Sequence, residues 1–253
     1  MAIDYTKPPR HAPGASAISL EKVQSAAPRL VNLYKAAQVS LEKSGLSGQR
    51  AAVYLILDRS RSMNAHYKDG TAQYLAEQVL GLSAHLDDDG TVPVVFFSTE
   101  VDGVSEVKLD AYEGRINELH SGYGAMGRTN YHLAMQAVID HYTASGAADP
   151  ALVIFQTDGG PTSRTAAEHV LCTAARLPIF WQFIGFGDPD SKQFDFLRKL
   201  DDLPVPAKRI VDNAGFFPAG PTPREVPDAK IYASLMSEFP LWLRAARAAG
   251  ILR

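Results

Sequence analysis

Three oxygen-bearing side chains occur at alternate positions directly after an apolar run. Asp58, Ser60 and Ser62 follow Val53–Leu57. An uninterrupted apolar run rich in branched and aromatic residues predicts a buried central strand of a parallel sheet. In open α/β sheets, ligands bind outside the carboxyl ends of the strands. Because hard cations such as Mg²⁺ and Ca²⁺ prefer oxygen ligands, this loop is predicted to hold a divalent cation.

Two further segments offer the same kind of ligand. Ala151–Thr157 predicts a second buried strand, which runs into Asp158. Thr129 lies in the glycine-bearing loop Ser121–Asn130, just before an apolar stripe at helical spacing. This loop lacks the Lys-Ser/Thr pair of a phosphate-binding P-loop. Thr129 is interpreted as the N-cap of the following helix, as a metal ligand, or as both.

Strand-like and helical segments alternate through the rest of the chain, and this alternation predicts an α/β fold. We expect three layers in a doubly wound arrangement, with a mostly parallel central sheet and an antiparallel edge strand at 101–107. Thr165 and Glu168 form a predicted capping box. The other predicted elements are strands at 92–98, 179–187 and 209–211, helices at 71–87, 165–175 and 228–239, and a proline-rich connector at 218–227.

Residues 1–49 are predicted to form a basic N-terminal arm, separate from a main domain at 50–253. Residues 1–50 hold seven Lys/Arg and three Asp/Glu, a net charge of +4, and the remainder carries 18 minus 25, or −7. Such an arm could be solvated and flexible, could fold back on the acidic body, or could engage a partner. Residues 1–17, which contain three prolines, are predicted to be extended or disordered.

Three short segments of the arm share a branched apolar residue, Ser or Asn, Leu, any residue, and Lys. They are Ile18–Lys22, Val31–Lys35 and Val39–Lys43. Their alternating apolar pattern is typical of strands, whereas their Glu, Lys and Ala spacers favour helices. Both interpretations stay open at this point.

The composition is that of an ordinary soluble globular protein, with 46% hydrophobic and 21% charged residues. The net charge of −3 argues against general binding to nucleic acid or to an anionic membrane. No apolar run approaches the roughly 18 residues of a membrane span, and the first residues lack a signal-peptide core. The single cysteine, Cys172, cannot form an internal disulfide. We therefore expect a cytoplasmic protein.

Taken together, the three loops resemble the metal-ion-dependent adhesion site (MIDAS) of the von Willebrand factor A (vWA) domain family. The resemblance covers about residues 50–215 and implies the vWA fold. It implies that Ser60, Ser62 and Thr129 bind a divalent cation through their hydroxyls, while Asp58 and Asp158 help directly or through water. The motifs are Asp-x-Ser-x-Ser-Met at 58–63, Gly-x-Thr-Asn at 127–130 and Thr-Asp-Gly at 157–159.

The resemblance also implies how such a site recognises a partner. Mg²⁺ is the expected cation, with Ca²⁺ or Mn²⁺ as alternatives. Three neutral hydroxyls leave much of the cation's charge uncompensated, so an open coordination position would favour a carboxylate from a protein partner. Arg61 stands where the family often has glycine. Arg59 and Arg128 flank the same mouth, where they would attract an acidic partner or simply be solvated.

Two C-terminal motifs make the sequence similar to the bacterial tellurium-resistance group of vWA proteins. They are Asp-Asn-Ala-Gly-Phe-Phe at 212–217 and Glu-Phe-Pro-x-Trp-Leu at 238–243. The repeats of the arm resemble segments of the companion stress proteins. This similarity implies a role in a tellurium-resistance or stress-response system.

The residues argue against two other classes of function. A phosphatase that forms an aspartyl-phosphate on Asp58 would generally need a second acid two residues later, where Ser60 stands. A serine nucleophile would need a general base, and none of the three loops contains histidine. An RNA-associated role, known for related vWA domains, is favoured only by the basic arm. We therefore expect a metal-dependent protein-interaction module and not an enzyme.

Overall fold

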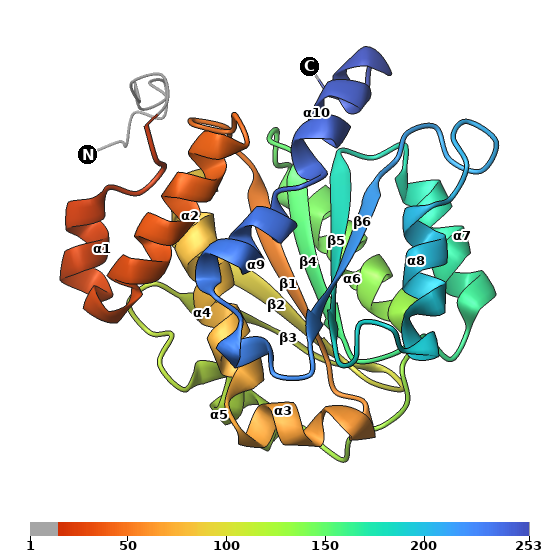
Figure 1. Cartoon of the computed structure of the whole chain (residues 1–253), viewed down its shortest axis with the longest axis horizontal. Helices are drawn as coiled ribbons and strands as arrows, with labels where there is room; N and C mark the ends of the chain where they lie inside the picture. Colours follow the sequence, from red (N-terminus) through yellow and green to blue (C-terminus); the bar gives the residue numbers. More distant parts are fainter. Residues whose placement is uncertain (1–14, 253) are drawn as a thin grey trace.

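The computed structural model of the chain describes residues 15–252, which form a six-stranded sheet between two layers of helices (Figure 1). The strand order is β3-β2-β1-β4-β5-β6. All neighbouring strands are parallel except β3, which pairs antiparallel with β2 at one edge. The predicted three-layer α/β fold with an antiparallel edge strand is therefore confirmed. No helix within residues 15–252 combines the length and apolar character needed to cross a bilayer.

The helices and strands have the following bounds. The strands are β1 (Ala52–Asp58), β2 (Thr91–Phe97), β3 (Val101–Lys108), β4 (Ala151–Thr157), β5 (Ile179–Phe186) and β6 (Ala214–Gly220). The α-helices are α1 (Leu20–Ala26), α2 (Val31–Lys43), α3 (Asn64–Lys68), α4 (Thr71–Leu86), α5 (Arg115–Gly122), α6 (Tyr131–Ser145), α7 (Arg164–Ala174), α8 (Asp195–Asp201), α9 (Asp228–Leu235) and α10 (Phe239–Ala248). Short 3₁₀ helices are η1 (Pro28–Leu30), η2 (Arg61–Met63), η3 (Lys192–Phe194) and η4 (Pro223–Glu225).

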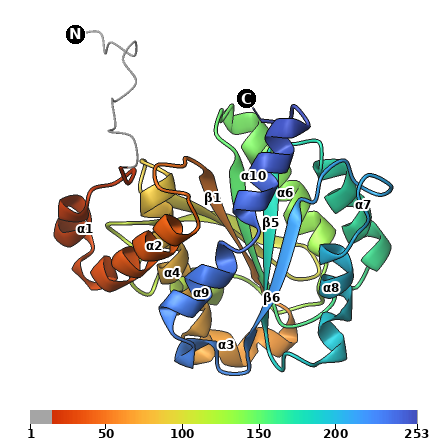
Figure 2. The ribbon, with the colours of Figure 1, turned by 45° about the horizontal axis from the view of Figure 1, so that its top comes forward.

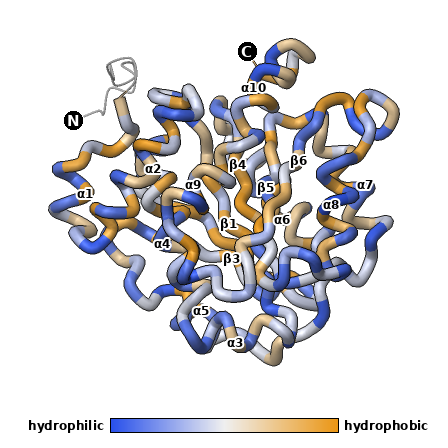
Figure 3. The backbone as a smooth tube through the Cα atoms, in the orientation of Figure 1, coloured by the Kyte–Doolittle hydropathy of each residue, from blue (hydrophilic) through white to orange (hydrophobic). Residues whose placement is uncertain are grey.

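The central strands are apolar on both faces because helices cover both faces of the sheet. Every residue of β4 and β5 is buried. One core lies between the sheet and helices α1, α2, α4, α9 and α10, and a second lies between the sheet and α6, α7 and α8. Figure 2 shows these two sets of helices on opposite sides of the sheet, and Figure 3 shows the apolar residues along the central strands.

Strand β1 is the point where the order of the strands reverses. The chain passes from β1 to β2 on one side of it and later returns to β4 on its other side. Leu57 of β1 is in register with Gln156 of β4, so these two parallel strands end side by side. The crevice outside the carboxyl ends of strands at such a point is the usual ligand site of this architecture. Asp58 and Asp158 both lie there.

The described part of the basic arm is helical and packs on the main domain. Its apolar side chains belong to the first core, including Val23, Leu33 and Tyr34. The Tyr34 hydroxyl donates to the carbonyl oxygen of Ile18 at 2.8 Å, and His85 of α4 contacts the Tyr34 carbonyl oxygen at the same distance. Residues 15–49 therefore fold back on the body. The separation into domains at residue 49 stays a prediction, and the predicted lead at 1–17 lies almost wholly outside the described residues.

Some local predictions were wrong. The last strand is β6 and not 209–211. Gly215 and Pro218 have low strand propensity, but β6 is an edge strand, where a missing N–H is tolerated. Residues 218–220, predicted as connector, belong to this strand. Helix α7 begins one residue before Thr165 and is capped by Ser163, whose hydroxyl accepts from the N–H of Ala166 at 3.4 Å. The predicted Thr165 capping box is wrong, because Thr165 lies inside the helix and Ser163 provides the N-cap hydroxyl.

Candidate metal centre

Asp58 is the last residue of β1, and its side chain is fully buried. One carboxylate oxygen accepts the N–H of Ser60 at 2.5 Å, and the other accepts the hydroxyl of Thr157 at 2.6 Å. Within residues 15–252, no basic side chain forms an ion pair with it. Burial raises the pKa of Asp58 to about 7, and the negative charge of Asp158 acts in the same direction.

The two serines lie at the start of η2, which follows β1 directly. Ser60 has an extended backbone and precedes this 3₁₀ turn as its N-cap residue. Its hydroxyl lies 3.2 Å from the hydroxyl of Ser62. Ser60 is 5% exposed, whereas Ser62 is exposed. The turn therefore presents two neighbouring hydroxyls beside the buried carboxylate, as the alternate spacing predicted.

The loop that carries Thr129 is fixed to the serine turn through Gly127. Gly127 forms an isolated parallel bridge with Ser60, and its carbonyl oxygen accepts the N–H of Arg61 at 3.2 Å. A Cβ atom on Gly127 would lie 2.4 Å from the hydroxyl of Thr99. Only glycine allows this close approach, so the residue that joins the two loops cannot carry a side chain without a local shift.

Thr129 is held by the loop that follows β4. Its carbonyl oxygen accepts the N–H of Thr162 at 2.7 Å, and its own N–H donates to the Thr162 hydroxyl at 3.3 Å. The N-cap position of α6 is Asn130, and no side chain caps this helix. The interpretation of Thr129 as an N-cap is therefore wrong, because α6 begins one residue too late. Its interpretation as a metal ligand stays open.

Asp158 is the first residue after β4 and is half-buried. It lies close enough to Asp58 for its charge to raise the pKa of that carboxyl. Thr157 joins the two aspartates, and its hydroxyl also accepts a hydrogen bond from the hydroxyl of Tyr131 at 3.1 Å. Thr157 and Gly127 belong to the motifs at 157–159 and 127–130 but were not predicted as site residues. Thr157 is next to Asp158, and Gly127 is two residues before Thr129. This closeness to predicted ligands was the signal in the sequence that could have identified them.

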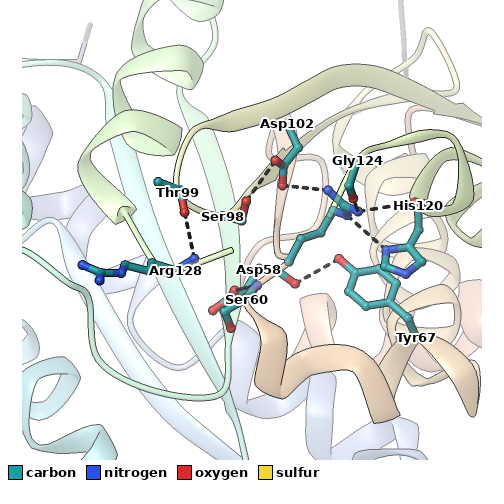
Figure 4. A network of polar contacts seen from close by, with 10 residues as sticks. Asp58, Ser60, Tyr67, Ser98, Thr99, Asp102, His120, Gly124 and Arg128 are labelled. Carbon is teal, nitrogen blue, oxygen red and sulfur yellow. Dashed lines mark hydrogen bonds and ion pairs between the residues drawn. The ribbon is translucent and has the colours of Figure 1, made fainter. Parts of the chain in front are cut away.

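Arg59 does not flank the mouth of the site, as the sequence suggested, but is 1% exposed. Its guanidinium lies 2.9 Å from the carboxylate of Asp102 and donates to His120 Nδ1 at 3.1 Å and to the Gly124 carbonyl oxygen at 2.9 Å. Figure 4 shows this network beside Asp58 and Ser60. Arg59 therefore ties β3, α5 and the loop after α5 to the end of β1, whereas the side chains of Arg61 and Arg128 are exposed.

Tyr67 connects this network to the end of β1. Its hydroxyl donates to the carbonyl oxygen of Asp58 at 3.0 Å, and its ring stacks on His120 with centroids 3.9 Å apart. Burial, together with the charge of Arg59, lowers the pKa of His120. A neutral His120 can accept the hydrogen bond from Arg59. The backbone of Asp58 is thus held from one side by Tyr67 and its carboxylate from the other by Thr157.

The donor set fits a hard divalent cation. Asp58 is a buried carboxylate without a cationic partner among the described residues, and such a charge is costly unless it is neutralised. Hydroxyl and carboxylate oxygens are the ligands that Mg²⁺ and Ca²⁺ prefer. No group of three or more His, Cys, Asp or Glu residues in the described part is arranged to hold a metal. Any cation here would therefore depend on the hydroxyls of Ser60, Ser62 and Thr129.

Comparison with known proteins identifies the family. A family model described as the vWA domain found in the C terminus of TerF matches residues 50–252. The chain belongs to this vWA-TerF-like family. It is also 33% identical, over 223 residues, to the uncharacterized protein YcbR of Bacillus subtilis (strain 168). That match covers 87% of this chain and 88% of the relative, so it includes part of the arm that the family model leaves out.

Solved structures with a similar fold are more distant from this vWA-TerF-like chain. The manganese-loaded TRAP protein of Plasmodium vivax has a TM-score of 0.48 and 19% identity, over 74% of each chain. Proximal thread matrix protein 1 of the mussel byssus, with a zinc-occupied MIDAS motif, has a TM-score of 0.46 and 16% identity. This chain, 78% of which is covered, spans about half (48%) of the mussel protein.

Proposed function

We propose that this vWA-TerF-like chain is a protein-interaction module whose binding depends on a divalent cation, with Mg²⁺ as the expected ion. Ser60, Ser62 and Thr129 would bind the ion through their hydroxyls, with Asp58 and Asp158 beside them. The observation that carries the proposal is the link between Ser60 and Gly127, which brings the Thr129 loop against the serine turn. A bound cation supplies an electrophilic centre for an anionic oxygen.

The proposed partner is a protein that presents a carboxylate to the ion. Ser62 is exposed and Thr129 is half-buried, so this side of the site is accessible from outside the protein. The exposed side chains of Arg61 and Arg128 lie on the same loops and would add attraction for an acidic surface. Asp58 is buried at the opposite, inner side and would compensate the charge of the ion.

We further propose that the site is not an enzyme's. Both carboxylate oxygens of Asp58 are already engaged, one by the Ser60 N–H and one by the Thr157 hydroxyl. A buried carboxylate held in this way is poorly placed to attack a phosphorus atom. Its hydrogen-bond partners instead suit a group that keeps one orientation beside a cation.

The biological setting is also a proposal. The family is named for TerF, and the sequence resembles the bacterial tellurium-resistance group. We therefore propose a role in a tellurium-resistance or stress-response system in the bacterial cytoplasm. Neither a membrane nor a nucleic acid is a proposed partner.

The deciding experiment is calorimetric titration of chelator-stripped protein with Mg²⁺, Ca²⁺ and Mn²⁺. Wild type should bind one of these ions saturably, and Asp58→Ala should not. The control Asp149→Ala removes an exposed carboxylate just before β4, at the other end of this strand, and should bind like wild type. Circular dichroism checks that Asp58→Ala is folded, and Asp58→Asn replaces it if it is not. Absence of binding by wild type, or equal binding by the Asp58 variant, would contradict the proposal.

A further inference from the structure

The two C-terminal motifs, at 212–217 and 238–243, are not part of the metal centre. They meet near the amino ends of the strands, opposite the metal centre. Asp212 precedes β6, and Glu238 precedes α10, which lies near the amino ends of β5 and β6 (Figure 1). Between them is a cavity of about 110 Å³. It is lined by Phe180, Asp212, Glu238, Leu241, Trp242 and Ala245. In Figure 1 the carboxyl ends of the strands, next to α3, lie at the other end of the molecule.

The surroundings of this cavity are acidic. An adjoining depression shares Asp212 and Ala245 with it and adds the side chains of Asp201 and Asp202. The residues that line the two hollows include four carboxyl groups and no basic side chain. Arg209, which is 2% exposed, pairs with Asp212 at 2.8 Å. One buried guanidinium thus accompanies four carboxyl groups in the two hollows, so their lining is acidic.

Buried polar groups beside the cavity have no hydrogen-bond partner among the described residues. Gln182 is fully buried, and both its amide oxygen and its amide nitrogen are unpaired. A Cβ atom on Gly215 would lie 2.9 Å from that oxygen and 3.0 Å from the carboxyl carbon of Glu238. The indole N–H of Trp242, which lines the cavity, is also unpaired, but as a donor it does not itself bind a cation. Unpaired buried groups are uncommon in native proteins, and here the Gln182 amide lies near the carboxyl group of Glu238.

The walls of the cavity distinguish an organic cation from a metal ion. Phe180 and Trp242 line it with ring centroids 5.6 Å apart. Aromatic faces attract ammonium and guanidinium groups, whereas a hard metal ion requires oxygen ligands on all sides. Within residues 15–252, no group of three or more carboxylates or other strong ligands is arranged for a metal. The carboxylates and aromatic rings that line the cavity together match an organic cation.

We propose that this cavity binds a guanidinium or alkylammonium group, held by Glu238 and Asp212 against the ring of Trp242. The cation would neutralise carboxyl groups that are otherwise crowded together. The raised pKa values of two of these groups are consistent with this crowding. Burial, followed by the charge of Glu238, raises the pKa of Asp201 to about 8. Burial, followed by the charge of Asp212, raises the pKa of Glu238. The site would work independently of the metal centre.

The group could belong to a free small molecule or to a basic side chain of a protein. The rim favours neither source by charge, but it carries exposed apolar side chains that a polypeptide could cover. Val205, Ile210 and Leu241 are 46%, 38% and 55% exposed. The experiment therefore compares methylguanidinium and ethylammonium with short peptides that contain one arginine or one lysine.

Binding is measured by calorimetry and by the NMR shift of the Trp242 indole N–H, with the neutral N-methylurea as a negative probe. Wild type should bind at least one cationic probe saturably and should not bind N-methylurea. Glu238→Gln should weaken binding roughly tenfold or more, the usual loss for a hydrogen bond to a charged group. The control Glu225→Gln removes an exposed carboxylate from η4, outside the cavity, and should bind like wild type.

A second variant guards against misfolding of Glu238→Gln. Ala245 is exposed, helical and shared by both hollows, so Ala245→Lys places an ammonium group beside the carboxylates. This variant should stay folded and should lose binding of the external probes. Asp58→Ala should bind the cationic probes like wild type, which would show that this site is independent of the metal centre. The proposal is overturned if no cationic probe binds, if N-methylurea binds equally well, or if both cavity variants bind like wild type. Binding of peptides alone would assign the site to a protein partner.

Discussion

The hydroxyl of Thr157 donates a 2.6 Å hydrogen bond to Oδ2 of Asp58, which lies 99 positions earlier in the chain. Both residues end central strands, β4 and β1, that are adjacent and parallel. The bond orients a buried carboxylate whose other oxygen is held by the N–H of Ser60. Groups that orient metal ligands from behind tune both the position and the basicity of those ligands.

Thr157→Val should therefore weaken cation binding, although Thr157 is not itself a proposed ligand. Valine keeps the shape of threonine but cannot donate to Asp58 or accept from Tyr131. We expect a loss of about 1–3 kcal/mol in the free energy of unfolding, the usual cost of leaving a buried polar group unpaired. Affinity for the divalent cation should fall roughly tenfold. Denaturant unfolding and calorimetry measure the two effects.

The matched control is Thr173→Val, on an exposed position of α7. It makes the same chemical change away from the site and should leave the affinity for the cation unchanged. If Thr157→Val binds the cation as tightly as wild type, the hydrogen bond from Thr157 to Asp58 does not contribute to cation binding.

Thr129→Ala should weaken cation binding and leave stability nearly unchanged. Because Asn130 is the N-cap residue and α6 has no side-chain cap, the substitution removes no capping bond. The contacts of Thr129 with Thr162 use its backbone, which alanine retains. We expect a change of less than about 0.5 kcal/mol in the free energy of unfolding without metal. A loss near 1 kcal/mol in excess chelator would instead reveal a structural role for the hydroxyl.

The central strands were predictable because helices cover both faces of the sheet and impose continuous apolar runs. The positions of Asp58, Ser60, Ser62 and Asp158 were predictable for a related reason, since they end or directly follow those strands, and their role as metal ligands stays a prediction. Strand β6 was missed because Gly215 and Pro218 oppose strand propensity, and the edge position that tolerates them is a property of the whole sheet.

The environment of Arg59 could not be predicted from local sequence. Its neighbours in the chain are the proposed ligands, which suggested a position at the mouth of the site. Its partners Asp102 and His120 come from β3 and α5, and only the three-dimensional fold brings them together. The helices of the arm were ambiguous for a different reason. Their short apolar repeats fit two periodicities, and packing of α2 against α4, and of α1 against α2, selects the helix.

Asp102→Asn should be strongly destabilising, because it leaves the guanidinium of Arg59 buried without its counter-charge. Arg59 is 1% exposed and the Asp102 side chain 15% exposed, so solvent cannot replace the lost partner. Removing one member of a buried ion pair typically costs about 3–5 kcal/mol in the free energy of unfolding. Glu106→Gln is the control, since Glu106 lies on the same strand and pairs with Lys108 at 3.2 Å on the surface.

Glu106→Gln should cost less than about 1 kcal/mol, because both partners of that pair are more than half exposed. Denaturant unfolding of the two variants gives the comparison. Equal stability of Asp102→Asn and Glu106→Gln would show that the other contacts of Arg59 suffice to compensate its charge.

The four carboxyl groups near α10, those of Asp201, Asp202, Asp212 and Glu238, should make the protein more stable as the pH falls from about 8 toward 5. Burial, followed by the charge of Glu238, raises the pKa of Asp201 to about 8, against an ordinary value of 3.8. Between these values the folded state binds more protons than the unfolded state, so the free energy of unfolding decreases as the pH rises. The groups that face Asp201 are Glu238, Asp212, Asp202 and the cation Arg209.

Asp201→Asn isolates this contribution from those of Asp58 and Asp87, whose pKa values are also raised by burial. The melting temperatures of wild type and variant are measured from pH 5 to pH 9 in excess chelator. The variant should gain less stability on acidification than wild type, and it should be the more stable of the two at pH 9, where it lacks a crowded negative charge. If the two curves run parallel across this range, Asp201 titrates at its ordinary pKa and the crowding of the cluster is relieved in solution.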